Sequence, residues 1–167
     1  MKIFNIILFI ILQSLVSVVF AQNCSDDIFE IKVTNKNPNE TQINYIDKSS
    51  SKFMYPPKFA SRVPMDRLAS FELVSIQKQD SIEEAVFTSK ELDTLKRGIA
   101  VVQVHVPSGK IASVSFLLQN EVDVDKLKKL KNEFENNLHF NVKLSAELEE
   151  EGYWGRSFRI FVSRRRK

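Results

Sequence analysis

Several features that mark familiar classes of protein are scarce or missing in this sequence of 167 residues. It has one cysteine, so no disulfide can form within the chain, and a disulfide-stabilised scaffold is excluded. Its four glycines leave little material for phosphate-binding loops, and no Gly-x-Ser-x-Gly or His-Glu-x-x-His motif occurs. The formal net charge is only +3, which gives no electrostatic case for binding nucleic acid.

The longest apolar stretch lies at the start of the chain. Lys2 is followed by a continuously apolar run over residues 6–12, which has the length of a signal-peptide core and falls short of the roughly 20 residues of a membrane span. Val19 and Ala21 supply small residues at the −3 and −1 positions of a cleavage site. We therefore expect residues 1–21 to be a signal peptide, and the mature protein to be exported, periplasmic or secreted, with no transmembrane anchor.

Two alternatives for this start stay open. The apolar segment would remain as a membrane anchor if it were not cleaved. Cys24 would carry a lipid if the protein were a lipoprotein, although Asn23 stands directly before it, where lipoprotein signals have a small residue.

The composition changes near residue 65, which divides the mature chain. Four of the five prolines lie before it, so residues 22–65 are predicted to form an irregular N-terminal extension with short strands at 28–34 and 42–47. Residues 66–163 are predicted to form the folded domain. Its first part, 66–78, fits either a helix or a strand.

The pattern becomes sharper beyond residue 88. Thr88 and Glu91 have the spacing of a capping box, which predicts a short helix over 89–97. Apolar and polar residues then alternate over 102–106 and again over 112–118, with turn residues between them. These two stretches predict a β-hairpin with one apolar face.

An amphipathic helix is predicted next, with Asp123 or Asp125 as its cap. Its apolar stripe consists of Val124, Leu127, Leu130, Phe134 and Leu138. Two more strands are predicted at 140–144 and 158–162, joined by a polar loop over 147–156. A helix lying across one face of an antiparallel sheet makes the fold class α+β.

Residues 100–162 resemble the C-terminal domain of TonB-type proteins. The resemblance rests on the valine-rich strand that begins at Ala100, the turn at Gly109, the second strand to Phe116, and the helix and final strand that follow. It implies a β-β-α-β arrangement and a place in the bacterial envelope. The sequence shows neither the Pro-rich spacer nor the retained anchor of the energy-transducing members, so the resemblance implies their topology and not their role.

Two histidines are the strongest candidates for chemistry. His105 and His139 are predicted on the sheet face opposite the helix, without an acidic residue beside them. The polar residues expected on the same face are Gln103, Ser113, Ser115, Asn141, Lys143 and Arg159. This face is either a solvated or covered surface, or a binding site to which Arg159 contributes. In the second case the protein is a small metal-binding protein or a hydrolase that uses both histidines.

Two further surfaces are candidates for recognition. Tyr153 and Trp154 are adjacent large aromatic residues in the predicted 147–156 loop, where they would either form a recognition tip or pack on the sheet. The chain ends in the basic tail 164–167, made of Arg164, Arg165, Arg166 and Lys167. Residues 22–163 carry 19 basic and 21 acidic side chains, so any affinity for an anionic surface would belong to this tail.

The sequence as a whole predicts an exported, non-enzymatic binding or interaction module of the bacterial envelope or medium. We expect no cofactor and no metal, and a partner that is another envelope protein or an anionic surface. In a further alternative, residues 156–163 form an unprotected edge strand, through which the protein assembles with a neighbour.

Overall fold

The computed structural model describes residues 23–37, 40–61, 69–74 and 76–162. The predicted signal peptide and the basic tail lie outside these residues. No helix in the described ranges is long and apolar enough to cross a membrane.

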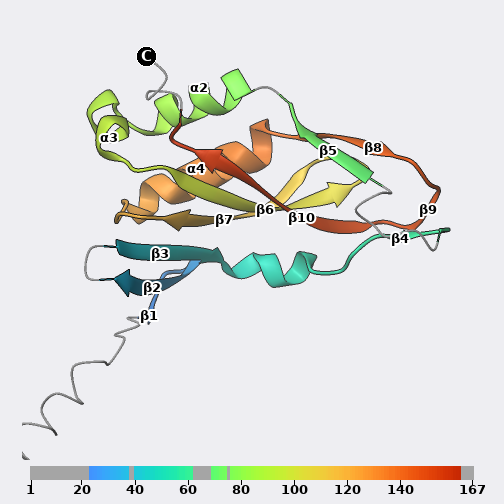
Figure 1. Ribbon diagram of the computed structural model, residues 1–167, viewed down its shortest axis with the longest axis horizontal. Helices are drawn as coiled ribbons and strands as arrows, with labels where there is room; N and C mark the ends of the chain where they lie inside the picture. Colours follow the sequence, from blue (N-terminus) through green and yellow to red (C-terminus); the bar gives the residue numbers. More distant parts are fainter. Residues whose placement is uncertain (1–22, 38–39, 62–68, 75, 163–167) are drawn as a thin grey trace, which may run out of the picture.

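A six-stranded antiparallel sheet forms one layer of the molecule, with the strand order β1-β2-β3-β7-β6-β10 (Figure 1). Its strands are β1 (Asn23–Ser25), β2 (Phe29–Asn37), β3 (Glu40–Asp47), β6 (Gly98–Val106), β7 (Ile111–Leu118) and β10 (Gly152–Ile160). The helices of the second layer pack on one face of this sheet, which confirms the α+β class.

The predicted N-terminal extension contributes two long strands to this sheet. The strands predicted at 28–34 and 42–47 are confirmed as β2 and β3, and β3 pairs with β7 at the register Tyr45–Phe116. Their inward residues, among them Phe29, belong to the same core as the helices. The sequence did not indicate this pairing, because proline-rich segments around the two strands hide their continuity with the domain.

Two smaller ribbons lie beside the main sheet. β5 (Ala69–Leu73) pairs with β8 (Phe140–Leu144), and β4 (Lys58–Phe59) pairs with β9 (Leu148–Glu150). The strand predicted at 140–144 therefore exists, but it is not part of the six-stranded sheet. An isolated bridge between Lys110 and His139 joins its start to the β6–β7 turn.

The second layer contains α2 (Ile76–Val86), α3 (Ser89–Thr94) and α4 (Val124–Asn137), while the short 3₁₀ helix η1 (Lys48–Phe53) follows β3. The capping box that begins α3 is confirmed, although the helix ends at Thr94 because Leu95 is already extended. Asp123 caps α4 by accepting a hydrogen bond from the backbone N–H of Asp125. The predicted apolar stripe faces the sheet, and Leu127, Leu130 and Phe134 are fully buried.

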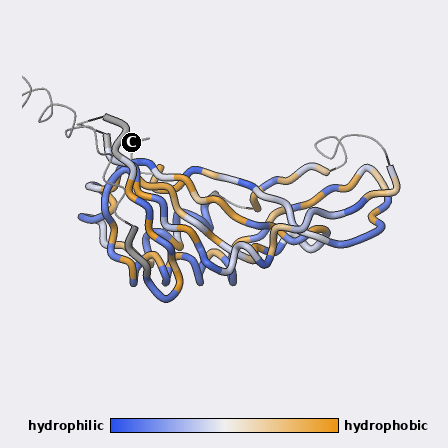
Figure 2. Tube along the Cα trace, turned by 90° about the horizontal axis from the view of Figure 1, so that it is seen from below, coloured by the Kyte–Doolittle hydropathy of each residue, from blue (hydrophilic) through white to orange (hydrophobic). Residues whose placement is uncertain are grey.

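The core lies between the sheet and these helices. Val102 and Val104 on β6 and Phe116 on β7 point into it, and Phe134 of α4 contacts Phe116 with ring centroids 6.4 Å apart. Hydrophobic and hydrophilic residues alternate along neighbouring strands, as Figure 2 shows. Because successive side chains of a strand point to opposite faces, this alternation fixes which face is buried.

A cluster of charged side chains lies largely buried where the junction of β3 and η1 meets α4. Lys131 of α4 places its Nζ 3.1 Å from Oδ2 of Asp47, and it also pairs with Glu135 one turn along the helix. The Asp47 carboxylate accepts hydrogen bonds from the backbone N–H groups of Ser49 and Val114. Burial raises the pKa of Glu135. The cluster ties β3, β7 and α4 together through partners that are far apart in sequence.

Candidate binding groove at the edge of β10

The structure places Tyr153 and Trp154 in a strand and not in a loop. β10 begins at Gly152, which pairs with Val106, and Tyr153 stands opposite His105. The loop predicted over 147–156 is therefore wrong: residues 148–150 form β9, and β10 begins at residue 152. Gly152 does not break the strand: a Cβ there would lie 2.5 Å from the backbone nitrogen of Pro57, so glycine allows the crossing segment to approach.

Tyr153 and Trp154 point to opposite faces of the sheet, as neighbours in a strand must. Tyr153 lies on the outer face, where its ring contacts Phe53, Tyr55 and His105 at centroid distances of 4.8, 5.1 and 5.1 Å. Burial and its neighbour Tyr55 raise the pKa of Tyr153. Trp154 lies on the inner face, with its ring 5.4 Å from that of Phe71. The two residues therefore belong to separate surfaces.

The two histidines are not brought together. The backbone of His105 pairs with that of Lys110, and Lys110 in turn forms a bridge to His139. The chain segment that contains Lys110 therefore lies between the two histidines. Two strand spacings correspond to about 9.5 Å between Cα atoms. In the part of the chain that the structure describes, no group of three His, Cys, Asp or Glu side chains is arranged to hold a metal ion.

His105 instead has two polar partners of its own. Its Nδ1 lies 2.8 Å from Oγ of Ser108, and its Nε2 lies 3.3 Å from Oε2 of Glu151. The prediction that no acidic residue lies beside the histidines is wrong for His105. Glu151 belongs to the predicted 147–156 loop, and the start of β10 brings it to the end of β6.

The remaining residues of the predicted outer face are scattered. Arg159 is exposed on β10, while Ser113 is buried on β7 and only 1% exposed. Asn141 and Lys143 lie on β8, and so on the smaller ribbon. The continuous polar patch predicted on this face does not form.

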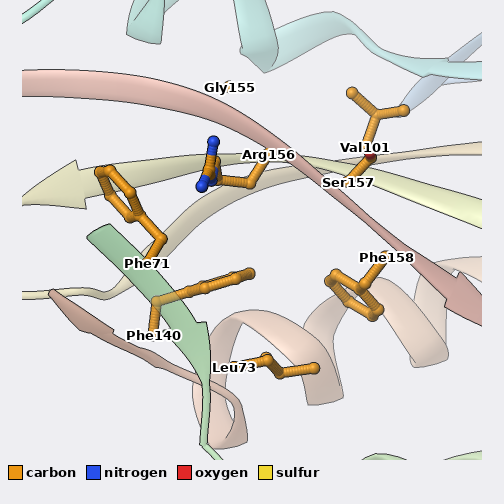
Figure 3. Close-up of a pocket in the computed structure, with 8 residues that line it drawn as sticks. All are labelled: Phe71, Leu73, Val101, Phe140, Gly155, Arg156, Ser157 and Phe158. Carbon is orange, nitrogen blue, oxygen red and sulfur yellow. The ribbon is translucent and has the colours of Figure 1, made fainter. Parts of the chain in front are cut away.

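A groove lies between the β5–β8 ribbon and β10 (Figure 3). It has a volume of about 560 Å³ and is open to solvent. Its apolar wall consists of Phe71, Leu73, Phe140 and Phe158. Residues 155–157 of β10 line its other side. We call this feature the β10 groove.

Of the described residues that line the β10 groove, Arg156 alone is charged. It stands opposite the buried Val102 and therefore points to the inner face. Its guanidinium carbon lies 4.6 Å from the centroid of the Phe71 ring, within the range of a cation–π contact. Among the described residues, no carboxylate forms an ion pair with Arg156.

β10 is the last strand of the sheet, and within the described ranges one of its edges has no neighbouring strand. The backbone N–H of Tyr153 donates to the carbonyl of Tyr55 at 2.9 Å, which closes one end of this edge. At the other end, Gln79 of α2 donates to the carbonyl of Arg159 at 2.8 Å. Glu83 of α2 accepts from the backbone N–H of Phe161 at 3.0 Å.

The open part of the edge lies between these contacts. Backbone groups in a strand alternate between its two sides, so Gly155 and Ser157 point the same way as Tyr153 and Arg159. No described residue forms a hydrogen bond with the outward N–H and C=O groups of Gly155 and Ser157. Both residues line the β10 groove, so the open edge and the apolar wall face the same space.

Arg156 was not among the site residues predicted from the sequence. The sequence does contain a signal for this site. The period-2 spacing of one strand face links Arg156 with Phe158 and Ile160. A charged side chain on such an apolar face is uncommon and points to a specific role. Because the predicted loop over 147–156 includes Arg156, the strand spacing was not recognised there.

The comparisons with known proteins bear on the fold alone. No known protein-family model matches the chain, and no curated protein matches it in sequence. A solved structure of a DUF5043 family protein from Bacteroides uniformis is similar to it, with a TM-score of 0.50 and 11% sequence identity over 85% of this chain and 86% of that one. The resemblance to TonB-type proteins stays a prediction.

Proposed function

We propose that this protein is an exported, non-enzymatic binding module of the bacterial envelope or medium, which takes an extended segment of another envelope protein at the edge of β10. The observation that carries the proposal is the short open edge at Gly155 and Ser157, closed on both sides and facing an apolar groove. The signal-peptide pattern of residues 1–21 supports export.

Strand addition suits this geometry. An extended segment gains main-chain hydrogen bonds from an open sheet edge, and pockets beside the edge select alternate side chains. The closed ends at Tyr153 and Arg159 limit the added strand to the residues opposite 154–158. Five residues of strand extend about 17 Å. A bounded site of this kind takes a short segment and does not propagate along the edge.

The test removes one edge hydrogen bond and leaves the sheet intact. In Ser157→Pro the outward N–H is lost, while the pairing with β6 is kept because it uses the alternate residues. Ser157→Ala keeps the N–H and is the matched control. Peptides of twelve residues selected from a random display library are the probes, and binding is measured by isothermal titration calorimetry.

We expect selected peptides to bind Ser157→Ala as they bind the wild type, and to bind Ser157→Pro about tenfold more weakly. The loss corresponds to about 1.4 kcal/mol, one hydrogen bond together with the bulk of the ring. Equal affinity for the three proteins would overturn the proposal, and so would a library that yields no binder. A dimer in light scattering that Ser157→Pro dissociates would also overturn it, because a second copy of this chain would then occupy the edge.

A second candidate is a hydrolase that uses His105 without His139. It rests on a separate observation, the row formed by Ser108, His105 and Glu151. A hydroxyl, an imidazole and a carboxylate in hydrogen-bond contact are the side chains of a nucleophilic hydrolase. Ser108 and Glu151 are exposed, in a turn and at the end of a strand. Labelling by a fluorophosphonate that disappears in Ser108→Ala would favour this alternative, and an unlabelled wild type would contradict it.

A further inference from the structure

The side chains on the inner face of β10 define what kind of segment the groove accepts; this step rests on the proposed function. In a strand added beside β10, the residue opposite Arg156 projects its side chain on the same face as Arg156. Gly155 and Ser157 supply the edge hydrogen bonds on either side of it. In an antiparallel pair this intervening position is the non-hydrogen-bonded one, where Cα atoms are about 4.5 Å apart and side chains approach most closely.

We infer that Arg156 selects an acidic side chain at this position of the bound segment. The guanidinium is held over Phe71 and is only partly exposed, so its orientation is restricted before a ligand arrives. None of the described carboxylates neutralises it. An arginine with a fixed planar fork in an apolar wall pairs best with a carboxylate, which can accept two parallel hydrogen bonds.

The neighbours of Arg156 on the same face specify the flanking positions. Two residues along β10, Phe158 packs against Phe134 and Phe140, with ring centroids 5.6 and 6.3 Å apart. Two residues in the other direction, Trp154 packs against Phe71. The bound segment should therefore carry apolar side chains two residues before and two residues after the acid.

The positions between them are expected to tolerate substitution. They would stand opposite Gly155 and Ser157, whose side of the sheet is the outer face. At Gly155 a Cβ would meet nothing closer than the Gln103 side chain at 3.8 Å, so space is available there. The inferred ligand is thus an extended peptide in which a single acidic residue lies between two apolar residues at a spacing of two.

The experiment uses three fluorescein-labelled peptides of seven residues. Each has Thr at positions 1, 3, 5 and 7 and Val at positions 2 and 6, and the central residue is Glu, Gln or Lys. Binding to the wild-type protein is measured by fluorescence anisotropy. We expect the Glu peptide to bind about tenfold more tightly than the Gln peptide, and the Lys peptide to bind more weakly than either.

Two variants of the protein test whether the preference for Glu depends on Arg156 itself or on positive charge elsewhere on β10. Arg156→Gln should reduce the preference for Glu over Gln to less than twofold. Arg159→Gln removes the same charge three residues away on the opposite face, and it should leave the tenfold preference unchanged. Thermal unfolding followed by circular dichroism confirms that both variants are folded.

The outcomes distinguish the two proposals. Equal binding of all three peptides to the wild type overturns the acidic preference and leaves strand addition standing. Loss of the preference in Arg159→Gln and not in Arg156→Gln also overturns it. If none of the peptides binds, and the random library yields none either, both the acidic preference and strand addition fail.

Discussion

Glu83 is a buried carboxyl group whose pKa is strongly raised. It lies on the buried side of α2 with an exposure of 2%. Its Oε2 accepts a hydrogen bond from the backbone N–H of Phe161 at 3.0 Å, and its Oε1 accepts one from Nε2 of Gln79 at 2.7 Å. Burial is the main cause that raises the pKa of Glu83 from 4.5 to about 7. The two hydrogen bonds lower this pKa and the charges of Asp80 and Glu84 raise it, and each of these effects is smaller than that of burial.

This raised pKa makes stability depend on pH in a defined direction. Between pH 4.5 and 7 the folded protein binds a proton at Glu83 that the unfolded chain has lost, so the free energy of unfolding falls as the pH rises. The contribution is fully present below about pH 4.5 and is lost as the pH passes through 7. A pKa moved from 4.5 to about 7 corresponds to about 3 kcal/mol, most of which is lost between pH 5 and pH 8.

Glu83→Gln removes the titration and keeps the shape of the side chain. Gln has a single acceptor oxygen for two facing donors, so the variant should be less stable than the wild type at pH 5, by about 1–2 kcal/mol. At pH 8 the wild type has an ionised buried carboxylate and the variant does not. Between pH 5 and pH 8 the difference between the two proteins should therefore shift by about 2.5 kcal/mol and change sign.

Urea unfolding followed by Trp154 fluorescence at pH 5, 6, 7 and 8 measures this difference. Other titrating groups, such as Asp26, whose pKa a backbone hydrogen bond from Ile28 holds well below its usual range, contribute equally to both proteins and cancel. Glu84→Gln, an exposed neighbour on the same helix, keeps Glu83 and is the control. Its stability should fall with pH nearly as the wild type's does, lessened only by the small effect of the Glu84 charge on the pKa of Glu83. Parallel curves for the wild type and Glu83→Gln would refute the reasoning.

Three further substitutions test other parts of the fold, each by urea unfolding. Lys131→Met leaves two carboxylates in the η1–α4 interface without their cation and should cost about 3 kcal/mol, whereas Lys129→Met on the exposed face of α4 should cost less than about 0.5 kcal/mol. Gly109→Ala should cost more than about 2 kcal/mol, because φ is +71° there and the new Cβ would meet a carbonyl oxygen at 1.8 Å. Gly155→Ala, where the space is open, is the contrasting case and should be nearly neutral. Thr88→Ala removes the capping box of α3 and should cost about 1 kcal/mol; an unchanged free energy of unfolding would contradict the role of the cap.

The elements that the sequence predicted well are those stabilised by local patterns. β6 alternates strictly and β7 does so from Val114 onward, and the stripe of α4 repeats at helical spacing, so burial of one face follows from the order of residues. The cap at Thr88 needs only a partner three residues away. In each case the information lies within one element.

The elements that escaped prediction depend on distant partners. α2 was not predicted because its buried side includes Gln79 and Glu83, which look like exposed residues until β10 supplies the carbonyl of Arg159 and the N–H of Phe161. The first half of β10 was read as a loop because two glycines and a run of acids precede its apolar part. Its pairing with β6 compensates for that weak local preference.

The proposed site depends on pairings that were not predicted from the sequence, although the strand at 140–144 itself was. α2 closes one end of the β10 edge and the Tyr55 segment closes the other, while β5 and β8 supply the apolar wall. An edge left open along all nine residues of β10 could template the pairing of further chains without limit. With both ends closed, the edge offers hydrogen bonds only at Gly155 and Ser157, and Arg156 stands between them. Closing the edge thus protects the protein from open-ended association and also fixes which residue of a bound segment faces the arginine.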